Sequence, residues 1–150
     1  MRAVVQRVKD CSVTVDDKII DKIDAGLLVY LGIGNDDTMD DVHYTADKIL
    51  NLRIFDDSDG KMNLSLLDMK GYGIIVVSQF TLYGDTRRGR RPSYSNAAPV
   101  KDARKMYEDF LHHLETLGLK PGRGEFQASM KVTYTNNGPV TILIDSRKQF

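Results

Sequence analysis

A run of β-branched apolar residues in the middle of the chain constrains the fold more than any other feature. Gly73 is followed by Ile74-Ile75-Val76-Val77, and four such residues in a row are typical of a strand that is buried on both faces. The run then continues into polar Ser78 and Gln79. We therefore predict a buried central strand that begins at Gly73 and has Ser78 and Gln79 at its end.

The polar end of this strand suggests a functional site. Buried hydroxyl and amide groups need hydrogen-bond partners, so Ser78 and Gln79 at the end of a core strand are candidates for contact with a ligand. The simpler interpretation is a strand end at which both side chains bond to nearby backbone. The two residues alone do not decide between these interpretations.

The rest of the chain alternates between helix-like and strand-like segments. Apolar residues recur at helical spacing between Met39 and Leu50, and again between Pro99 and Gly118. Strand patterns cover residues 2–8, a hairpin over 12–20, and residues 26–34, 54–55, 126–135 and 140–145. No repeat or linker divides the chain. We predict one domain over residues 1–150, an α/β fold in which mixed β-sheets pack against each other and two main helices lie on the outside.

Composition restricts the cellular setting and the partners. The single cysteine, Cys11, excludes an internal disulfide and fits a reducing cytoplasm. No apolar stretch approaches the length of a membrane span, and the strand-like N-terminus lacks the features of a signal peptide, so we expect a soluble cytoplasmic protein with no membrane partner. The 21 Lys and Arg residues balance 21 Asp and Glu residues. Any contact with nucleic acid must therefore come from a local patch.

One such patch follows the central strand directly. The loop over residues 83–95 contains Arg87, Arg88, Arg90 and Arg91, four arginines among five residues. Arginine suits bidentate contact with phosphate, and a polyanionic substrate would be steered to a position beside the suspected site. The alternative is an exposed, solvated charge run. We favour phosphate or nucleic-acid binding by this arginine loop.

The usual catalytic arrangements are missing. His112 and His113 are adjacent on a helix and point about 100° apart, so they cannot share one metal, and His43 lies on the exposed side of its helix pattern. The acidic turn 56–60 has no Glu between residues 61 and 70, so we interpret it as a solvated turn and not as a calcium loop. A P-loop, a dinucleotide fingerprint and a G-x-S-x-G elbow are also missing. We expect neither a metal nor a cofactor.

A second unusual stretch, residues 136–141, reads Asn-Asn-Gly-Pro-Val-Thr. Asn137-Gly138 suits a hairpin turn, but Pro139 removes a hydrogen-bond donor at the start of the returning strand. The carbonyl groups of Gly138 and Pro139 are left as acceptors with fixed directions. From these residues alone, an edge-strand turn is the preferred interpretation.

Taken together, the two stretches resemble the motifs of the D-aminoacyl-tRNA deacylase family. Ser78-Gln79-Phe80-Thr81 matches the S-Q-x-x motif of that family, and residues 136–141 match its N-x-G-P-x-T motif, both without a gap. The resemblance covers the whole chain, including residues 2–8, 91–94, 124–126 with Met130, and 143–146. Gly84 and Tyr94 depart from the expected Ala and Phe, but they lie in the arginine loop and outside both motifs.

The resemblance implies the fold of this family and a homodimer whose active sites lie at the subunit interface. A cis Gly138-Pro139 bond of one subunit would face the site of the other. The catalytic positions that the resemblance implies are Ser78, Gln79, Phe80 and Thr81.

The remaining implied roles concern the substrate, aminoacylated tRNA. Arg7 would hold the Gly-Pro turn in its orientation. Phe126 and Met130 would line the pocket around the terminal adenosine.

The implied reaction is hydrolysis of the ester between an amino acid and the terminal ribose of tRNA. This acyl group is already activated, so the enzyme has to orient it, stabilise the oxyanion and place a water. Backbone amides near Phe80 and Thr81 are candidate oxyanion donors, and the ribose 2′-hydroxyl is a candidate activator of the water. The Gly-Pro carbonyls would exclude the side chain of an L-residue, whereas D-residues and glycine would be accepted.

Two alternatives remain open. One is an esterase in which Thr81 is the nucleophile, which requires a base from elsewhere in the fold. The other is a non-catalytic RNA-binding module that uses the arginine loop.

Overall fold

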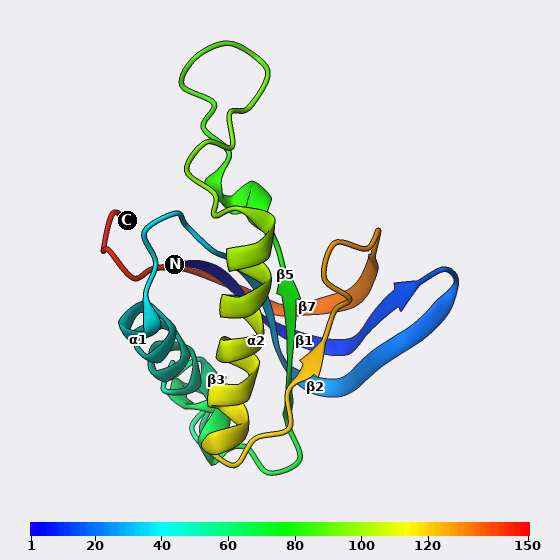
Figure 1. Cartoon of the computed structure of the whole chain (residues 1–150). Helices are drawn as coiled ribbons and strands as arrows, with labels where there is room; N and C mark the ends of the chain where they lie inside the picture. The colour runs from blue at the N-terminus through cyan, green and yellow to red at the C-terminus, as the bar shows by residue number, and fades with distance from the viewer.

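The computed structural model describes residues 1–150 and contains a twisted five-stranded mixed sheet with the strand order β6-β5-β2-β1-β7 (Figure 1). β1 (Arg2–Val15) pairs in antiparallel orientation with both β2 (Lys18–Gly32) and β7 (Lys131–Asp145). β5 (Gly73–Ser78) runs parallel to β2 and to the short strand β6 (Gly122–Arg123). β7 is therefore one edge of the sheet and β6 the other.

β5 is the buried central strand that the apolar run predicts. Ile74, Ile75, Val76 and Val77 are each at most 2% exposed. Ile74 and Val76 belong to the main core, whereas Ile75 and Val77 belong to a smaller apolar cluster on the opposite face of the sheet. Because side chains alternate along a strand, both faces of β5 are covered, which confirms the prediction.

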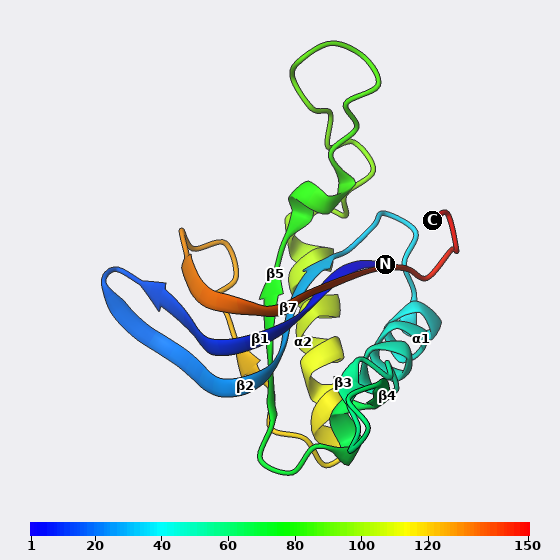
Figure 2. The same cartoon turned by 180° about the vertical axis from the view of Figure 1, so that it is seen from behind.

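Two helices cover the face of the sheet that carries the main core, and they lie on the same side of it in both views (Figures 1 and 2). α1 (Met39–Leu50) begins after Thr38, which forms a capping box with Asp41. α2 (Val100–Thr116) begins after Pro99. The buried side chains of α2 are Tyr107, Phe110, Leu111 and Leu114. No helix of the structure is long and apolar enough to cross a membrane.

A small second sheet completes the fold. β3 (Phe55–Asp56) pairs with β4 (Met62–Leu64), and a short 3₁₀ helix, η1 (Leu66–Asp68), follows. The predicted fold class is thereby confirmed: a single α/β domain has a mixed five-stranded sheet, a second small sheet and two main helices.

The central strand ends where the apolar run of the sequence ends. β5 ends at Ser78, and residues Phe80–Tyr83 form a 3₁₀ helix, η2. The backbone N–H of Gln79 donates to the Leu31 carbonyl at 2.8 Å where the chain turns away from β2. Gly32 makes room for this turn, since a Cβ there would lie 3.0 Å from the Gln79 carbonyl oxygen. Ser78 and Gln79 therefore stand at the end of the central strand, as the sequence predicts.

β7 is one strand and not two strands joined by a turn. The β1 residues on either side of Arg7 pair with Thr141 and Asn136, so residues 137–140 stand opposite Arg7 alone. These four residues form a bulge within β7, and the expected edge-strand turn is wrong. Asn136 closes the base of this Gly-Pro bulge by donating from Nδ2 to Thr141 Oγ1 at 3.1 Å.

Candidate active site

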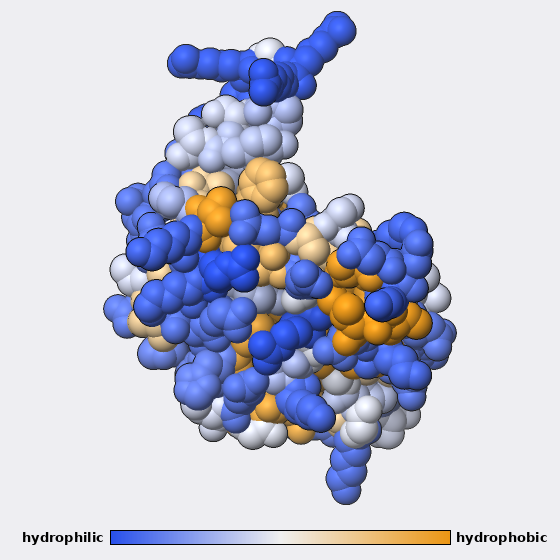
Figure 3. Space-filling view, turned by 45° about the vertical axis from the view of Figure 1, so that its right-hand side comes forward, coloured by the Kyte–Doolittle hydropathy of each residue, from blue (hydrophilic) through white to orange (hydrophobic).

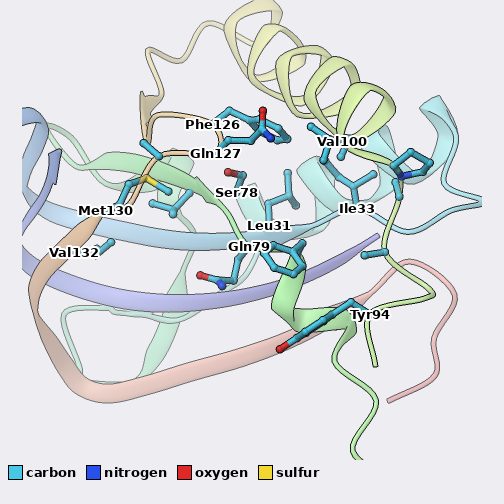
Figure 4. A pocket seen from close by; sticks show the side chains of 17 residues that line it. Leu31, Ile33, Ser78, Gln79, Tyr94, Val100, Phe126, Gln127, Met130 and Val132 are labelled. Carbon is cyan, nitrogen blue, oxygen red and sulfur yellow. The ribbon is translucent and has the colours of Figure 1, made fainter. Parts of the chain in front are cut away.

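A cavity of about 620 Å³ opens at the end of β5, beside the first turn of α2 (Figure 4). This volume falls within the range of small-molecule sites, about 300–1,000 Å³. Most of the lining side chains are apolar, and they come from the ends of β2 and β5, the start of α2 and the segment before β7. The lining residues are Leu31, Ile33, Val77, Ser78, Gln79, Phe80, Tyr94, Ala97, Ala98, Pro99, Val100, Ala103, Phe126, Gln127, Ala128, Met130 and Val132.

The S-Q motif reaches the cavity from the end of β5. Figure 4 shows Ser78 on the side of Phe126 and Gln79 directed away from it, as alternation along a strand requires. Phe80, the first residue of η2, also lines the cavity, whereas Thr81 is exposed and does not. Gln79 Nε2 donates to Thr81 Oγ1. The structure therefore brings three of the four S-Q-x-x residues to the cavity.

Phe126 forms a wall of the cavity that α2 holds in place. Its ring centroid lies 5.7 Å from that of Tyr107, and the Arg104 guanidinium lies 4.7 Å from the Phe126 centroid. Arg104 Nη2 also donates to Gln127 Oε1 at 3.1 Å. Tyr107 and Arg104 both belong to α2, so packing against this helix, and not the loop alone, determines the orientation of Phe126.

Met130 occupies space that a glycine leaves free. A Cβ on Gly124 would lie 2.6 Å from Met130 Sδ. The Gly124 N–H donates to the Val76 carbonyl at 3.0 Å, and the Tyr107 hydroxyl donates to the same carbonyl at 2.8 Å. Burial raises the pKa of Tyr107, so its hydroxyl stays protonated and remains a donor.

The first residue of β1 and the last residue of β7, which are paired in the sheet, hold η2 in position. Arg2 Nη1 donates to the Leu82 carbonyl at 3.1 Å, and Arg2 Nε pairs with the Asp145 carboxylate at 3.0 Å. The Asp145 side chain is buried, and the Arg2 guanidinium lies 4.7 Å from the centroid of the Tyr83 ring. A guanidinium fixed by a buried carboxylate presents its remaining N–H groups in a defined direction.

Arg7 lies outside the cavity, beside the Gly-Pro bulge. Its side chain is buried, its Nε donates to the Asn137 carbonyl at 2.9 Å, and its Nη1 donates to the Ile54 carbonyl at 2.7 Å. Arg7 therefore contacts the bulge where the resemblance expects it.

Gly138 and Pro139 are exposed and are not part of the cavity lining. Their peptide bond is cis, and Gly138 has a φ of +140°. A Cβ on Gly138 would lie 2.9 Å from the Val140 backbone nitrogen. Within one chain, the structure does not bring the Gly-Pro pair to Ser78 and Gln79.

The cavity lacks the groups of side-chain catalysis. Its polar side chains are Ser78, Gln79, Tyr94 and Gln127, and none of its lining residues has a carboxylate, imidazole, thiol or amine. A serine hydroxyl needs a neighbouring base to act as a nucleophile. Cys11 is buried in the smaller cluster, where burial raises its pKa to about 11. The cavity can therefore bind and orient a polar group between apolar walls, but it supplies no general base.

Sequence reasoning missed one wall of the cavity. Residues 97–100 and Ala103 line it from the start of α2. Three of these five residues are alanines beside the proline that begins the helix, and small side chains at a helix start leave space next to the sheet. The alanine cluster is the feature that indicates this wall in the sequence.

The arginine loop forms an arm that projects from the body of the molecule (Figure 1). Phe80 and Tyr94, which lie on either side of the base of the arm in the sequence, both line the cavity. Asp85 and Ser93 pair at the neck of the arm through two backbone hydrogen bonds of 2.8 and 2.9 Å. Beyond the neck, the Arg87 guanidinium forms two hydrogen bonds with the Asp85 carboxylate, at 2.9 and 2.7 Å. These bonds lower the pKa of Asp85 to about 2, so the pair stays ionised at neutral pH.

Sequence comparisons match nearly the whole chain. The model of the D-Tyr-tRNA(Tyr) deacylase family matches residues 4–145. The D-aminoacyl-tRNA deacylase of Thermosipho melanesiensis is 60% identical over 151 residues, and that of Thermosipho africanus is 57% identical over 150 residues. Both alignments cover 100% of this chain and 100% of the relative.

Two solved structures share the fold. The c-Myc DNA Unwinding Element Binding Protein superposes with a TM-score of 0.90 at 42% identity, covering 97% of this chain and 98% of that chain. A probable eukaryotic D-amino acid tRNA deacylase superposes with a TM-score of 0.83 at 17% identity, covering 95% and 97%. The second likeness concerns the fold alone.

Proposed function

The chain belongs to the D-Tyr-tRNA(Tyr) deacylase family, and from this premise we propose that it hydrolyses the ester bond of D-aminoacyl-tRNA to free D-amino acid and tRNA. It is thus a hydrolase of carboxylic esters, and residues 1–150 act as one deacylase domain in the cytoplasm. The observation that carries the proposal is the cavity at the end of β5, which has two polar side chains of the S-Q motif and no side-chain base. Such a site suits an acyl group that is already activated, as an aminoacyl ester is.

The terminal adenosine and its ester occupy the cavity in this proposal. Phe126 offers a face for stacking of the adenine, and Met130 fills the adjoining wall. Stacking of a base on an aromatic side chain contributes about 1–3 kcal/mol. Ser78 and Gln79 bind the polar ester and ribose, which accounts for polar groups at the end of a core strand.

Backbone and substrate groups perform the chemistry. Phe80 and Thr81 begin η2, and the first N–H groups of a helix have no partner inside it. These N–H groups stabilise the oxyanion that forms when water attacks the ester carbonyl. The ribose 2′-hydroxyl activates that water, because the lining has no carboxylate or imidazole. Changing the terminal adenosine to 2′-deoxyadenosine, with the amino acid on O3′, is expected to slow hydrolysis at least about 100-fold, the usual scale of acid–base assistance.

A second subunit completes the site and selects the D-isomer. Gly138 and Pro139 of one subunit enter the cavity of the other, a proposal that their exposure and their separation from their own chain's cavity support. Arg7 fixes the direction of the bulge through the Asn137 carbonyl. The side chain of an L-residue would collide with the Gly-Pro backbone, whereas a D-side chain points away from it. Glycine has no side chain to exclude, so glycyl-tRNA mischarged on other tRNAs is also cleaved.

Deacylation of D-, L- and glycyl-tRNA with the same tRNA body tests the proposal. We expect hydrolysis of the D- and glycyl-esters and retention of the L-ester. Hydrolysis of the L-ester at the D-rate would overturn the chirality argument. Binding of tRNA without hydrolysis of any ester would favour the non-catalytic RNA-binding module. Sedimentation equilibrium tests the homodimer, which predicts twice the chain mass of 16.9 kDa.

The Thr81 nucleophile is the second candidate mechanism. Thr81 is exposed, lies outside the cavity lining, and its Oγ1 accepts a hydrogen bond from the Gln79 amide. A donor beside the hydroxyl oxygen does not remove its proton, so this environment favours the water mechanism.

A further inference from the structure

We propose that three arginines of the arm, Arg88, Arg90 and Arg91, bind backbone phosphates of the tRNA upstream of the esterified adenosine. The inference rests on the proposed function, because it takes the ester to be bound in the cavity at the end of β5. In this inference the arm binds the substrate and takes no part in hydrolysis of the ester.

The base of the arm has a defined position relative to the cavity. The Asn35 N–H donates to the Asn96 carbonyl at 3.1 Å, and Asn35 Nδ2 donates to the Ser95 carbonyl at 2.7 Å. On the other side, the arm continues directly from η2, where the Gly84 N–H donates to the Thr81 carbonyl at 2.9 Å. A polynucleotide whose 3′ end is bound in the cavity therefore meets the arm at a fixed place.

The charges of the arm divide into one neutralised arginine and three free ones. Arg87 is held by Asp85, with an Nη2–Oδ2 distance of 2.7 Å. Arg88, Arg90 and Arg91 are exposed and form no hydrogen bond or ion pair with other side chains of this chain. The tip of the arm is almost entirely hydrophilic in the space-filling view (Figure 3).

Three unpaired guanidinium groups within the four residues 88–91 match the chemistry of a phosphodiester backbone. The chain carries equal numbers of acidic and basic residues, so its attraction for a polyanion depends on such local concentrations of charge. Guanidinium groups contact phosphate through two parallel N–H groups, and they are more weakly hydrated than ammonium groups. The arm also emerges at the rim of the substrate cavity, which favours the substrate's own backbone over an acidic protein partner.

The length of the arm limits which phosphates it reaches. Residues 86–92 lie beyond the neck formed by Asp85 and Ser93. Seven residues that run out and back extend about 10 Å past the neck. The tip therefore lies away from the ester and beside nucleotides that precede the terminal adenosine.

The triple variant Arg88→Gln/Arg90→Gln/Arg91→Gln tests the inference on two substrates, full-length D-aminoacyl-tRNA and the D-aminoacyl ester of adenosine alone. On tRNA we expect a higher KM with an unchanged kcat. Three lost phosphate contacts to the single-stranded 3′ end, each with a salt slope of about 0.7, predict that the KM of the wild type rises about 20-fold more than that of the variant between 50 and 200 mM salt. On the adenosine ester, which does not reach the arm, the two proteins are expected to have equal kcat/KM.

The triple variant Lys61→Gln/Lys70→Gln/Lys120→Gln is the matched control. It removes the same charge from exposed lysines in the segments that follow β3, η1 and α2. Figure 1 shows the segments after β3 and α2 at the opposite end of the molecule from the arm. We expect it to keep the wild-type KM and salt dependence. The inference is overturned if the arm variant keeps the wild-type KM and salt dependence on tRNA. It is also overturned if the arm variant loses as much activity on the adenosine ester as on tRNA, or if the lysine variant raises the KM for tRNA as much as the arm variant does. If the wild type cleaves neither substrate, the proposed function itself is wrong, which is a different result.

Discussion

Arg7 and Asn137, which lie 130 positions apart in the chain, are joined by a hydrogen bond of 2.9 Å from Arg7 Nε to the Asn137 carbonyl. The same guanidinium donates from Nη1 to the Ile54 carbonyl at 2.7 Å and pairs with Asp56 at 3.2 Å. One buried side chain on β1 thus holds the Gly-Pro bulge and the segment that leads into β3. This arrangement couples the stability of the fold to the position of the bulge.

Arg7→Gln is expected to lower the free energy of unfolding by about 2–3 kcal/mol, because charged hydrogen bonds are lost and two backbone carbonyls lose their donor. Deacylation of D-aminoacyl-tRNA should fall as well, since the bulge loses its support. Urea unfolding and steady-state kinetics measure the two effects. Arg7→Lys keeps the charge but not the planar guanidinium group. It should restore less than half of the lost stability and less than half of the lost deacylation activity. A destabilised Arg7→Gln protein with wild-type kinetics would show that Arg7 serves the fold alone.

Gly138→Ala is expected to reduce deacylation strongly. At a φ of +140°, the added Cβ would lie 2.7 Å from Val140 Cγ2 and 3.2 Å from Arg7 Nη2, so the bulge must shift. Gly71→Ala is the matched control, because Gly71 also has a positive φ, +77°, but has nothing within 4 Å of its added Cβ. It should cost about 1 kcal/mol of stability and leave kcat/KM unchanged. If the two variants have equal kcat/KM, the Gly-Pro bulge has no role in the active site.

Thr81→Ala is expected to keep deacylation within about tenfold of the wild type, since the change removes one hydrogen bond and no reacting group. The Thr81-nucleophile mechanism predicts instead a loss of roughly 10⁴-fold or more, with an acyl-enzyme detectable by mass spectrometry in the wild type. Single-turnover kinetics with D-aminoacyl-tRNA distinguish the two outcomes.

Phe126→Leu is expected to raise KM by about 5- to 150-fold, the range that corresponds to 1–3 kcal/mol of base stacking, while kcat changes little. Leucine keeps an apolar side chain against Tyr107 but offers no aromatic face. Phe126→Tyr is the control that retains the face, and it should keep the wild-type KM. Inhibition by free adenosine provides a second measurement, since it should weaken in parallel. A leucine variant with an unchanged KM would place the adenine elsewhere.

The stability of the protein is expected to decrease on acidification below about pH 6.5. The pKa of His113 is lowered, first by burial and then by the positive charge that His43 and His112 acquire. The His43 and His113 ring centroids lie 4.5 Å apart. Below the ordinary histidine pKa of about 6.5, the unfolded chain then binds more protons at this position than the native chain does. Unfolding is therefore favoured as the pH falls.

His113→Gln should remove part of this pH dependence, as measured by urea midpoints between pH 5 and pH 7.5. The effect is moderate, because the ring is only partly buried and solvent screens the charges. Parallel stability profiles for the variant and the wild type would rule out His113 as the group responsible.

Local sequence patterns predict which segments form helices and strands, whereas pairing with a neighbouring strand determines where each strand ends. The helical spacing between Met39 and Leu50 and the β-branched run after Gly73 appear in the structure as α1 and β5. The exposed pair Lys9 and Asp10 interrupts the alternation in β1 and resembles a loop, yet the strand continues through it because β2 pairs with it on one side. No local pattern contains the information on that pairing.

The parts of the candidate site that consist of short motifs can be predicted from the sequence. Ser78 and Gln79 stand out because polar groups end an apolar run. The wall at the start of α2 arises when a helix and a strand end meet in space, so only the alanines at 97, 98 and 103 point to it. Arg7 shows no local feature of a role, and its contact with Asn137 exists only after β1 and β7 have paired.

The pairing of β1 with β7 joins two strands that are synthesised far apart in time, since one covers Arg2–Val15 and the other Lys131–Asp145. Every residue that lines the cavity has been made once the ribosome reaches Val132, whereas the Gly-Pro bulge and most of the β7 partners of β1 come later. Contacts between distant parts of a chain form late in folding. A nascent chain that stops before Asn136 therefore has an open β1 edge, which favours association with other chains. Prematurely terminated products should aggregate and be degraded, and they should not act as deacylases of relaxed chirality.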